Sequence, residues 1–197
     1  MINSLGEIVV LGLQSRSDRW QRCLEIFEAE GIKKVTRYQT EINHEDKHRG
    51  ATKDFLELLR KKRGRQIMFF EDDFELTQNW REVLGEAWNE VPKDFDLFYL
   101  GANLTSKPVK VSDHVVRVLG AWCLHAVVFS PKFIDYILSS YDVNKHWVFD
   151  EWCRVVAPQR KFYMCVPMIS YQRESFSDFA NKYVSYNLFE NKFYKRI

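Results

Sequence analysis

Three consecutive carboxylates, Glu71, Asp72 and Asp73, form the strongest chemical signal in the sequence. They directly follow Gln66–Phe70, a run that is apolar after its first residue and predicts a strand covered on both faces. Like charges this close raise one another's pKa unless a positive charge is supplied. A hard divalent cation such as Mg²⁺ or Mn²⁺ supplies that charge, and it prefers carboxylate oxygens while leaving positions open for phosphate oxygens. The alternative is a solvated acidic turn that leads into a helix.

The acids follow a stretch of chain in which short apolar runs alternate with amphipathic segments. Strands are predicted at 7–13, 35–38, 66–70 and 95–100, and helices from 17 to 31, at 52–61 and from 79 onward. This alternation is typical of a parallel sheet with helices on both faces. Ligands of such sheets bind at the carboxyl ends of the strands, and the acids fall at one of these ends.

The second half of the sequence has a less regular pattern. Strands are predicted at 115–118, 125–129 and 162–166, with helices after Ser130-Pro131 and from 150 to just before Pro158. Polar loops are predicted at 40–50 and 142–147. No internal repeat or low-complexity linker divides the chain, so we expect a single α/β domain over residues 1–197, built on a mostly parallel, Rossmann-like sheet flanked by helices.

Composition narrows the classes of protein that fit. The chain has 197 residues, of which 46% are hydrophobic, and this suits a folded domain and not a disordered one. A net charge of +2 does not indicate a strongly basic nucleic-acid binder. The four cysteines show no C-x-x-C spacing, so we expect reduced, mostly buried thiols and neither disulfides nor a zinc site. We see no signal peptide and no transmembrane segment, and we expect a cytoplasmic location.

Other charged and aromatic residues leave alternatives open. The basic run Arg60–Arg65 is either a solvated turn at a helix C-terminus or a contact for an anionic acceptor. The tryptophans Trp122, Trp147 and Trp152 either stack on sugars or bases, or belong to the core. The five histidines lack ligand spacing, so we expect structural or surface roles for them, and His125 is the exception to examine.

Several segments, taken together, resemble glycosyltransferases of the GT-A fold. The strand that ends in Glu71-Asp72-Asp73 resembles their metal-binding D-x-D element, and the wider pattern is similar to glycosyltransferase family 25, which includes lipooligosaccharide and collagen galactosyltransferases. One departure is Lys53-Asp54, which stands where the family has Ser-His. The matching segments are Leu11–Arg19, Gly50–Asp54, Phe98–Gly101, Gly120-Ala121 before His125–Ser130, and the series Pro167, Gln172, Ser177 and Asp178.

The resemblance implies a GT-A-like fold, a nucleotide-diphosphate sugar donor such as a UDP-sugar, and Mn²⁺ or Mg²⁺ to bridge the two phosphates. Residues 1–105 would form the nucleotide-sugar half of the domain, and residues 106–197 the acceptor half. Asp73 and Glu71 would be the metal residues, Glu71 through a metal-bound water or by facing the ribose. Arg16 and Arg19 would pair with phosphate oxygens, unless they are only surface charge. The donor would be bound by Arg16, Arg19, Glu71, Asp72, Gln172, Ser177 and Asp178.

A second acidic pair, Asp150-Glu151, opens a predicted helix after an aromatic-rich loop. If the transfer inverts the sugar, the acceptor hydroxyl needs a general base, and a carboxylate here can accept its proton. Neighbouring helix residues lie about 100° apart around the axis, so only one of the two acids can point into a cleft. We expect Asp150 to be the base, with Glu151 next. The alternative is a plain acidic helix N-terminus.

Two other functions fit the same residues. A metal-dependent nuclease or phosphohydrolase also clusters acids, although the further acids, histidines or lysine that it normally needs form no recognisable set here. A non-catalytic relative that binds nucleotide or glycan is the other alternative, although the intact acidic motif favours an enzyme. For a transferase, the acceptor is either a surface glycan or lipid-linked sugar, or a hydroxylated DNA base.

Overall fold

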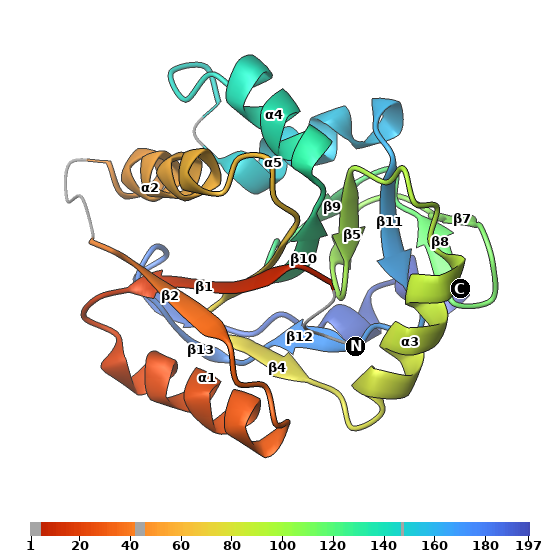
Figure 1. The fold of residues 1–197 in the computed structure, drawn as a ribbon, viewed down its shortest axis with the longest axis horizontal. Coiled ribbons are helices and arrows are strands. Elements are labelled where there is room, and N and C mark those ends of the chain that lie inside the picture. Colours follow the sequence, from red (N-terminus) through yellow and green to blue (C-terminus); the bar gives the residue numbers. More distant parts are fainter. Residues whose placement is uncertain (1–4, 42–45, 147) are drawn as a thin grey trace.

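The structure is a computed structural model that describes residues 5–41, 46–146 and 148–197. One sheet of eight strands forms its centre, and five α-helices lie against this sheet in the described residues (Figure 1). The sheet strands are β1 (Glu7–Leu13), β2 (Val35–Thr40), β3 (Ile67–Glu71), β5 (Leu97–Tyr99), β7 (Val109–Lys110), β8 (Val115–Arg117), β10 (Ala126–Phe129) and β11 (Phe162–Cys165). The helices are α1 (Ser17–Ala29), α2 (Lys47–Lys61), α3 (Trp80–Glu90), α4 (Pro131–Ser140) and α5 (Phe149–Val156).

The sheet is mixed, in the order β2-β1-β3-β10-β5-β11-β8-β7. β1 is parallel to β2 and β3, as the alternating first half of the sequence predicts. β10 then inserts between β3 and β5 and is antiparallel to both, and β8 is antiparallel to β11. The expectation of a mostly parallel sheet is therefore wrong in the middle of the sheet, because a strand from the second half of the chain separates two strands from the first half.

Helices cover both faces of the sheet and create two hydrophobic cores (Figure 1). α2, α4 and α5 pack on one face, and α1 and α3 pack on the other. Side chains of a strand point alternately to the two faces. Accordingly, Val9 and Phe69 belong to the first core, whereas Val10 and Phe70, the next residues of the same strands, belong to the second. Both central strands are thus buried on both sides, which explains their uninterrupted apolar sequence.

Three small antiparallel pairs lie outside the main sheet, and the sequence pattern did not predict them as pairs. β4 (Phe74–Leu76) pairs with β12 (Ser170–Gln172), which places Gln172 opposite Phe74, one residue after the acids. β13 (Ser175–Ser177) and β14 (Lys182–Val184) form a hairpin, which in the described part of the chain is a separate two-stranded sheet. β6 (Asn103–Leu104) pairs with β9 (Ala121–Trp122). The β4–β12 pair brings the C-terminal segment to the carboxyl end of β3. Short 3-10 turns occur at Ala157–Gln159, Leu188–Glu190 and Tyr194–Arg196.

The helix starts differ in part from the predictions. The helix predicted after Ser130-Pro131 is α4, and the Ser130 hydroxyl caps it by accepting a hydrogen bond from the amide of Phe133 at 3.3 Å. Ser17 makes no capping bond, and α1 already begins at this residue. α2 begins at Lys47, well before the predicted start, because the Asp46 side chain caps it. The loop predicted at 40–50 is therefore shorter, and its residues 42–45 lie outside the described residues.

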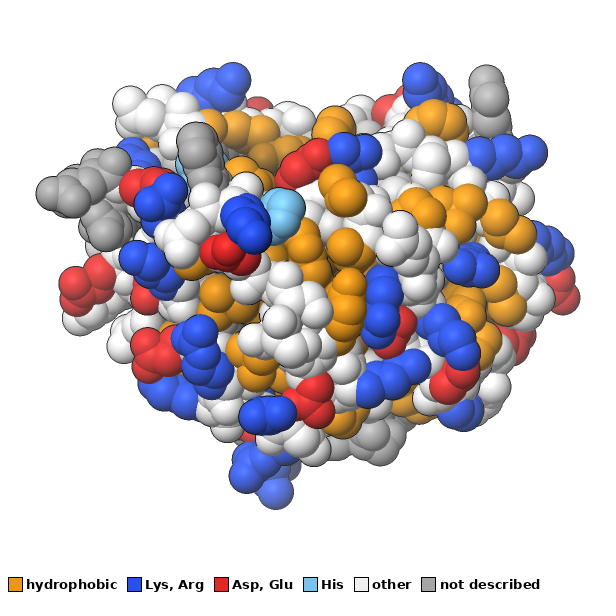
Figure 2. All heavy atoms as spheres, turned by 90° about the horizontal axis from the view of Figure 1, so that it is seen from above, with side chains coloured by type: hydrophobic (Ala, Val, Ile, Leu, Met, Phe, Trp, Pro, Cys, Tyr) orange, Lys and Arg blue, Asp and Glu red, His pale blue; other side chains and the backbone are white. Residues whose placement is uncertain are grey.

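The basic run Arg60–Arg65 lies at the amino end of β3, whereas the acids lie at the carboxyl end of the same strand. Ion pairs within the molecule compensate most of its charges: Lys61 with Glu57, Lys62 and Arg65 with Glu7, and Arg63 with Asp135. On the face seen in Figure 2, basic and acidic side chains are interspersed and form no field of one sign. These findings favour the solvated-turn interpretation of the run. No helix of the described ranges combines the length and apolarity needed to cross a membrane.

Candidate functional site

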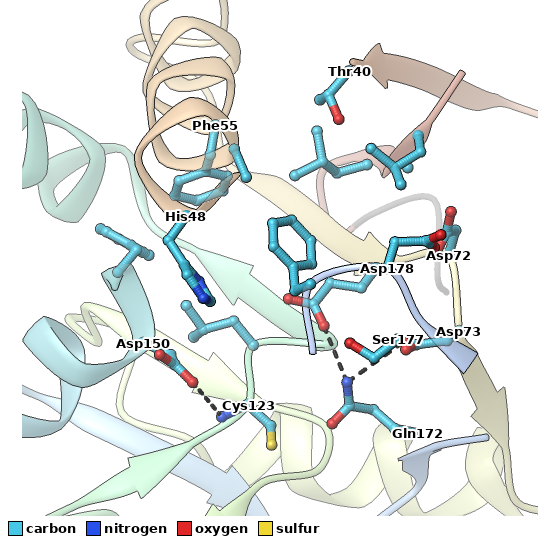
Figure 3. Close-up of a pocket in the computed structure, with 18 of the residues that line it drawn as sticks. Thr40, His48, Phe55, Asp72, Asp73, Cys123, Asp150, Gln172, Ser177 and Asp178 are labelled. Carbon is cyan, nitrogen blue, oxygen red and sulfur yellow. Dashed lines mark hydrogen bonds between the residues drawn. The ribbon is translucent and has the colours of Figure 1, made fainter. Parts of the chain in front are cut away.

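A pocket of about 330 Å³ lies at the carboxyl ends of β1 and β3, next to the amino end of β10 (Figure 3). Helices α2 and α5 and the β13–β14 hairpin contribute the remaining walls. Apolar side chains from β1, α2 and β3, such as Leu11, Phe55 and Phe69, line its interior. Most of the predicted site residues line the same pocket: Arg19, Glu71, Asp72, Asp73, Asp150, Gln172, Ser177 and Asp178. Arg16 and Glu151 do not line it.

Asp72 is buried and turned towards α1. Its Oδ1 accepts a hydrogen bond from Arg19 Nη1 at 2.8 Å. Its Oδ2 lies so close to the backbone of β1 that a Cβ added at Gly12 would come within 2.4 Å of it. Burial raises the pKa of Asp72, and the hydrogen bond from Arg19 opposes that increase. Asp72 therefore fixes the acidic turn to the rest of the fold, and it needs a glycine beside it.

Glu71 and Asp73 lie on the other side of the turn and share one neighbour. The side-chain nitrogen Nε2 of Gln172 lies 3.2 Å from Glu71 Oε2 and 3.5 Å from Asp73 Oδ1 (Figure 3). Burial raises the pKa of Glu71 well above its usual value, and the charges of Asp73 and Asp150 raise it further. Burial also raises the pKa of Asp73, although Arg19 lowers it. Asp73 Oδ2 lies 3.6 Å from Arg19 Nη1, so Asp73 shares this guanidinium with Asp72, whereas the Gln172 amide is the hydrogen-bond donor at Glu71.

The chemistry of these donors fits a hard divalent cation. Gln172 faces the carboxylates of Glu71 and Asp73 with Nε2, and its buried Oε1 has no hydrogen-bond partner in the described residues. A half-turn of the side-chain amide would exchange the two atoms and present an oxygen beside the carboxylates. Carboxylate and amide oxygens are the ligands that Mg²⁺ and similar ions prefer. No group of three or more histidine, cysteine or acidic side chains in the described ranges is arranged to hold a metal. A cation here would therefore need further oxygens from water or from a phosphate.

Both predicted phosphate-binding arginines have partners within the chain. Arg19 is buried, and its Nη2 donates to Ser175 Oγ and to the carbonyl of Phe176, each at 2.8 Å. Arg16 pairs with Asp18 and, through Nη1, with Asp178 Oδ2 at 2.7 Å. The hydrogen bond from Arg16 lowers the pKa of Asp18 to about 2. A phosphate could bind either guanidinium only by sharing or replacing these partners, and the phosphate role remains a prediction.

The β13–β14 hairpin covers one side of the pocket with Ser177, Asp178 and Phe179. Besides the contacts of Arg16 and Arg19, Lys47 Nζ donates to the carbonyl of Asp178 at 3.0 Å. Phe179 stacks on His48, with ring centroids 5.5 Å apart. Among the residues that the structure describes, the hairpin has no strand partner in the main sheet, and these side-chain contacts hold the predicted donor residues Ser177 and Asp178 at the pocket.

Asp150 and Glu151 point in different directions, as the helical spacing predicts. Asp150 lines the pocket opposite Gln172 and accepts a hydrogen bond from the amide of Cys123 at 3.4 Å (Figure 3). Burial raises its pKa, and the charge of Glu151 adds to the increase. Glu151 instead accepts from Arg154 and from Trp122 Nε1, and these bonds lower its pKa to about 2. Of the two acids, Asp150 lines the pocket and Glu151 does not, and the base role of Asp150 remains a prediction.

Several lining residues were not predicted as site residues. His48 points into the pocket from the first turn of α2 (Figure 3). The sequence signal for this helix start is Asp46, whose side chain can cap the amide three residues later. This signal would have placed His48 on a helix. Thr40, at the end of β2, and Cys123, which has a φ of 72°, had no such signal. His44 and Trp147 lie outside the described residues.

Two residues that the sequence analysis considered for the site, His125 and Trp152, belong to the interior of the protein. His125 is fully buried, and burial lowers its pKa to about 4, so it is a neutral core residue and does not face the pocket. Trp152 is buried among the aromatic residues of α4 and α5. Trp122, by contrast, is 44% exposed and directly precedes the pocket residue Cys123. Of the described tryptophans named from the sequence, only Trp122 could stack on a ligand.

Comparison with known proteins informs the fold alone. No protein-family model matches the chain, and no curated protein matches it in sequence. Among solved structures, it is similar to the crystal structure of A197 from STIV, with a TM-score of 0.54 and 14% sequence identity. The similarity covers 92% of this chain and 94% of that chain. The two proteins therefore share a mixed α/β architecture over nearly their whole length.

Proposed function

We propose that this chain is a glycosyltransferase that moves a sugar from a nucleotide-diphosphate sugar to an acceptor hydroxyl, with Mn²⁺ or Mg²⁺ at its acids. The observation that carries the proposal is the pocket in which Glu71, Asp73 and Gln172 face Asp150. A GT-A-like fold belongs to the same proposal. Its support is the helix-covered sheet, with the pocket at the carboxyl ends of β1 and β3.

Glu71 and Asp73 would hold the cation, with Gln172 Oε1, after a half-turn of its amide, as a further oxygen donor. When bound, a divalent cation neutralises the charge that develops on a leaving diphosphate. Asp72 and Arg19 would have a structural role, since their 2.8 Å ion pair keeps the acidic turn in place. The apolar wall formed by Leu11, Phe55 and Phe69 suits the uncharged part of a bound donor.

Asp150 would take the proton of the acceptor hydroxyl. It lies across the pocket from the metal residues, where an acceptor oxygen could approach the donor sugar (Figure 3). As that oxygen bonds to the sugar carbon, the bond from this carbon to the diphosphate oxygen breaks, and the proton passes to the Asp150 carboxylate. The raised pKa of Asp150 brings it closer to neutral pH, where a general base is most effective.

The proposal is tested by thermal unfolding with UDP-, GDP-, CMP- and dTDP-sugars, each with Mn²⁺ and with EDTA. One donor should stabilise the fold only with the metal, by about 2.7 kcal/mol at a hundredfold excess over its dissociation constant. For a chain of this size, that corresponds to about 2–4 °C for each kcal/mol. Equal stabilisation in EDTA, or none with any donor, would contradict the proposal.

Asp73→Ala should remove the metal-dependent stabilisation and leave the fold intact, because it removes a pocket carboxylate and no core side chain. Glu75→Gln is the matched control. Glu75 lies two residues further along the chain, pairs with Arg22 and Arg173, and does not line the pocket. If both variants lost the donor response equally, the effect would come from net charge and not from the metal residues.

A further inference from the structure

An exposed aromatic side chain lies beside the proposed base. Trp122 ends β9, and Cys123, the next residue, donates its backbone amide to Asp150. A tryptophan is a large apolar group, and 44% of the surface of Trp122 is exposed. Within the pocket, Val148, Phe179 and Tyr186 are exposed as well.

The orientation of Trp122 is fixed by hydrogen bonds. Its indole Nε1 donates to Glu151 Oε2 at 2.8 Å, and Arg154 Nε donates to the same oxygen at 2.7 Å. The indole is therefore held by an ionised carboxylate that is itself held by a guanidinium. On its C-terminal side the backbone is constrained too, since Cys123 has a left-handed φ of 72°, which is unusual for a residue with a side chain. A ring fixed in this way loses little further freedom when a ligand stacks on it.

We propose that Trp122 is a stacking platform for a hexopyranose ring of the acceptor, and that Glu151 is the positioning residue that holds it. The inference rests on the proposed function, because it assigns the acceptor side of the same site. The face of an indole ring is electron-rich, and the C–H groups on one face of a pyranose ring carry partial positive charge. Trp122 directly precedes the pocket residue Cys123, whose amide donates to Asp150, so a sugar stacked on Trp122 would lie at the edge of the pocket that holds Asp150.

The local charge favours a sugar over a nucleic acid. Bases also stack on aromatic rings, but nucleic-acid binding depends on cations that meet the phosphates. Next to Trp122 lie two carboxylates, Asp150 and Glu151, and the cation of Arg154 is paired with Glu151. The basic run Arg60–Arg65 is at the other end of β3 and is largely paired.

Nuclear magnetic resonance of the ¹⁵N-labelled full chain tests this platform without any donor. The probes are the methyl glycosides of glucose, galactose and N-acetylglucosamine, and a short single-stranded oligodeoxynucleotide. The indole N–H signal of Trp122 is assigned by its absence in Trp122→Phe. We expect at least one glycoside to shift this signal while those of Trp20 and Trp88 stay unchanged, since these residues lie on α1 and α3.

Trp122→Ala should weaken binding of that glycoside about tenfold, whereas Trp122→Phe, which keeps an aromatic face, should lose much less. Glu151→Gln keeps an acceptor oxygen and should bind nearly as well as wild type, while Glu151→Ala should resemble Trp122→Ala. Tyr183→Ala is the control for loss of an exposed aromatic group, because Tyr183 is 75% exposed and outside the pocket.

If no glycoside shifts the Trp122 signal, or if only the oligodeoxynucleotide does, the platform proposal is wrong. If a glycoside binds at Trp122 but no nucleotide-sugar stabilises the protein, the platform is supported as a glycan-binding site and the transfer reaction is refuted. Donor stabilisation should be the same in Trp122→Ala and wild type. A loss of both responses would instead show a disturbed pocket and overturn the separate acceptor role.

Discussion

The three consecutive acids have three different surroundings. Neighbouring residues of an extended chain point to opposite sides. Asp72 accordingly points towards α1 and pairs with Arg19, while Glu71 and Asp73 both face Gln172. One carboxylate of the triplet therefore anchors the turn. Burial raises the pKa of the other two because it disfavours their charged forms, and a bound cation would stabilise those charged forms.

Asp150→Asn tests whether the Asp150 carboxylate is the general base. The amide keeps the size of the side chain and can still accept the bond from Cys123, but it cannot take a proton. We expect donor stabilisation near that of wild type and a transfer rate about 10²–10⁴-fold lower. Single-turnover transfer from the donor identified by thermal shift is the measurement.

Glu151→Gln is the matched control for this experiment, since Glu151 points away from the pocket. It should keep a turnover number near that of wild type. Full activity in Asp150→Asn together with a collapse in Glu151→Gln would reassign the base to Glu151. Full activity in both variants would require a base elsewhere in the pocket.

Gly12→Ala tests the close contact between β1 and the acidic turn. The added Cβ would lie 2.4 Å from Asp72 Oδ2, so the carboxylate must move and weaken its bond to Arg19. We expect a loss of about 1–3 kcal/mol in the free energy of unfolding, measured with urea. In the Asp72→Ala background the clash is absent, and the added cost of Gly12→Ala should shrink. An equal cost in both backgrounds would show that Asp72 is not the cause.

At the scale of elements, the β13–β14 hairpin differs from the β1 and β3 walls of the pocket, because in the described residues it forms a sheet of its own. The side chains of Arg16, Arg19 and Lys47 connect it to α1 and α2. Segments held by few contacts open more easily than the core. The walls formed by β1 and β3 are therefore firm, while the hairpin wall depends on ion pairs.

Asp178→Asn should loosen this hairpin, because it removes one charge of the 2.7 Å pair with Arg16. We expect amide hydrogen exchange in the hairpin to become about tenfold faster, while β1 and β3 keep their protection. Asp113→Asn is the control, since Asp113 forms an exposed pair with Lys110 far along the sheet. Unchanged exchange in Asp178→Asn would show that the other contacts suffice.

Local patterns predicted most elements but not all of their partners. The strands at 7–13, 35–38 and 66–70, and the helices with apolar stripes, were correctly placed, because alternation and helical periodicity reflect what a segment buries. The insertion of β10 between β3 and β5 was not predicted, since an apolar run such as Ala126–Phe129 has the same pattern whichever buried strands it pairs with. The β4–β12 pair was missed because each strand is only three residues long.

In the site, too, local features were predicted from the sequence and long-range contacts were not. The acids and the Asp150-Glu151 pair were found from their residue types, and helical spacing predicted that only one of the pair would face a cleft. Gln172 was named only through the family resemblance, because its place beside Glu71 depends on the long-range β4–β12 pair. The hydrogen bonds from Arg16 and Arg19 to the hairpin could not be predicted from the sequence either, because their partners lie about 160 residues away along the chain.

At the scale of the whole molecule, an ion-pair cluster far from the pocket couples stability to pH. His114, just before β8, lies 2.8 Å from Glu90 and 2.8 Å from Glu86, both on α3. The hydrogen bond with Glu90 raises the pKa of His114 above its usual value. The folded protein therefore holds this proton more tightly than the unfolded chain, and the pair stabilises the fold while His114 is charged.

This stabilisation should be complete below the unfolded pKa of about 6.5 and should disappear as pH rises through the higher folded value. Relative to His114→Asn, the wild type should thus lose up to about 1 kcal/mol of unfolding free energy between about pH 6 and pH 8, since the pair is partly exposed. Urea unfolding of both proteins across this range measures the difference. A constant difference would show that His114 keeps the same charge throughout.

The unequal burial of the four cysteines makes the site chemically addressable. Cys23, Cys153 and Cys165 are fully buried in the two cores, whereas Cys123 lines the pocket and is 9% exposed. Burial raises the pKa of the Cys123 thiol well above its usual value, so alkylation will be slow at neutral pH, but the other three thiols are less accessible still. A small electrophile should therefore modify the native protein at one position, next to Asp150. The rate of that modification, measured by mass spectrometry, would therefore report whether the pocket is occupied. It would do so whichever sugar, nucleotide or metal fills the space.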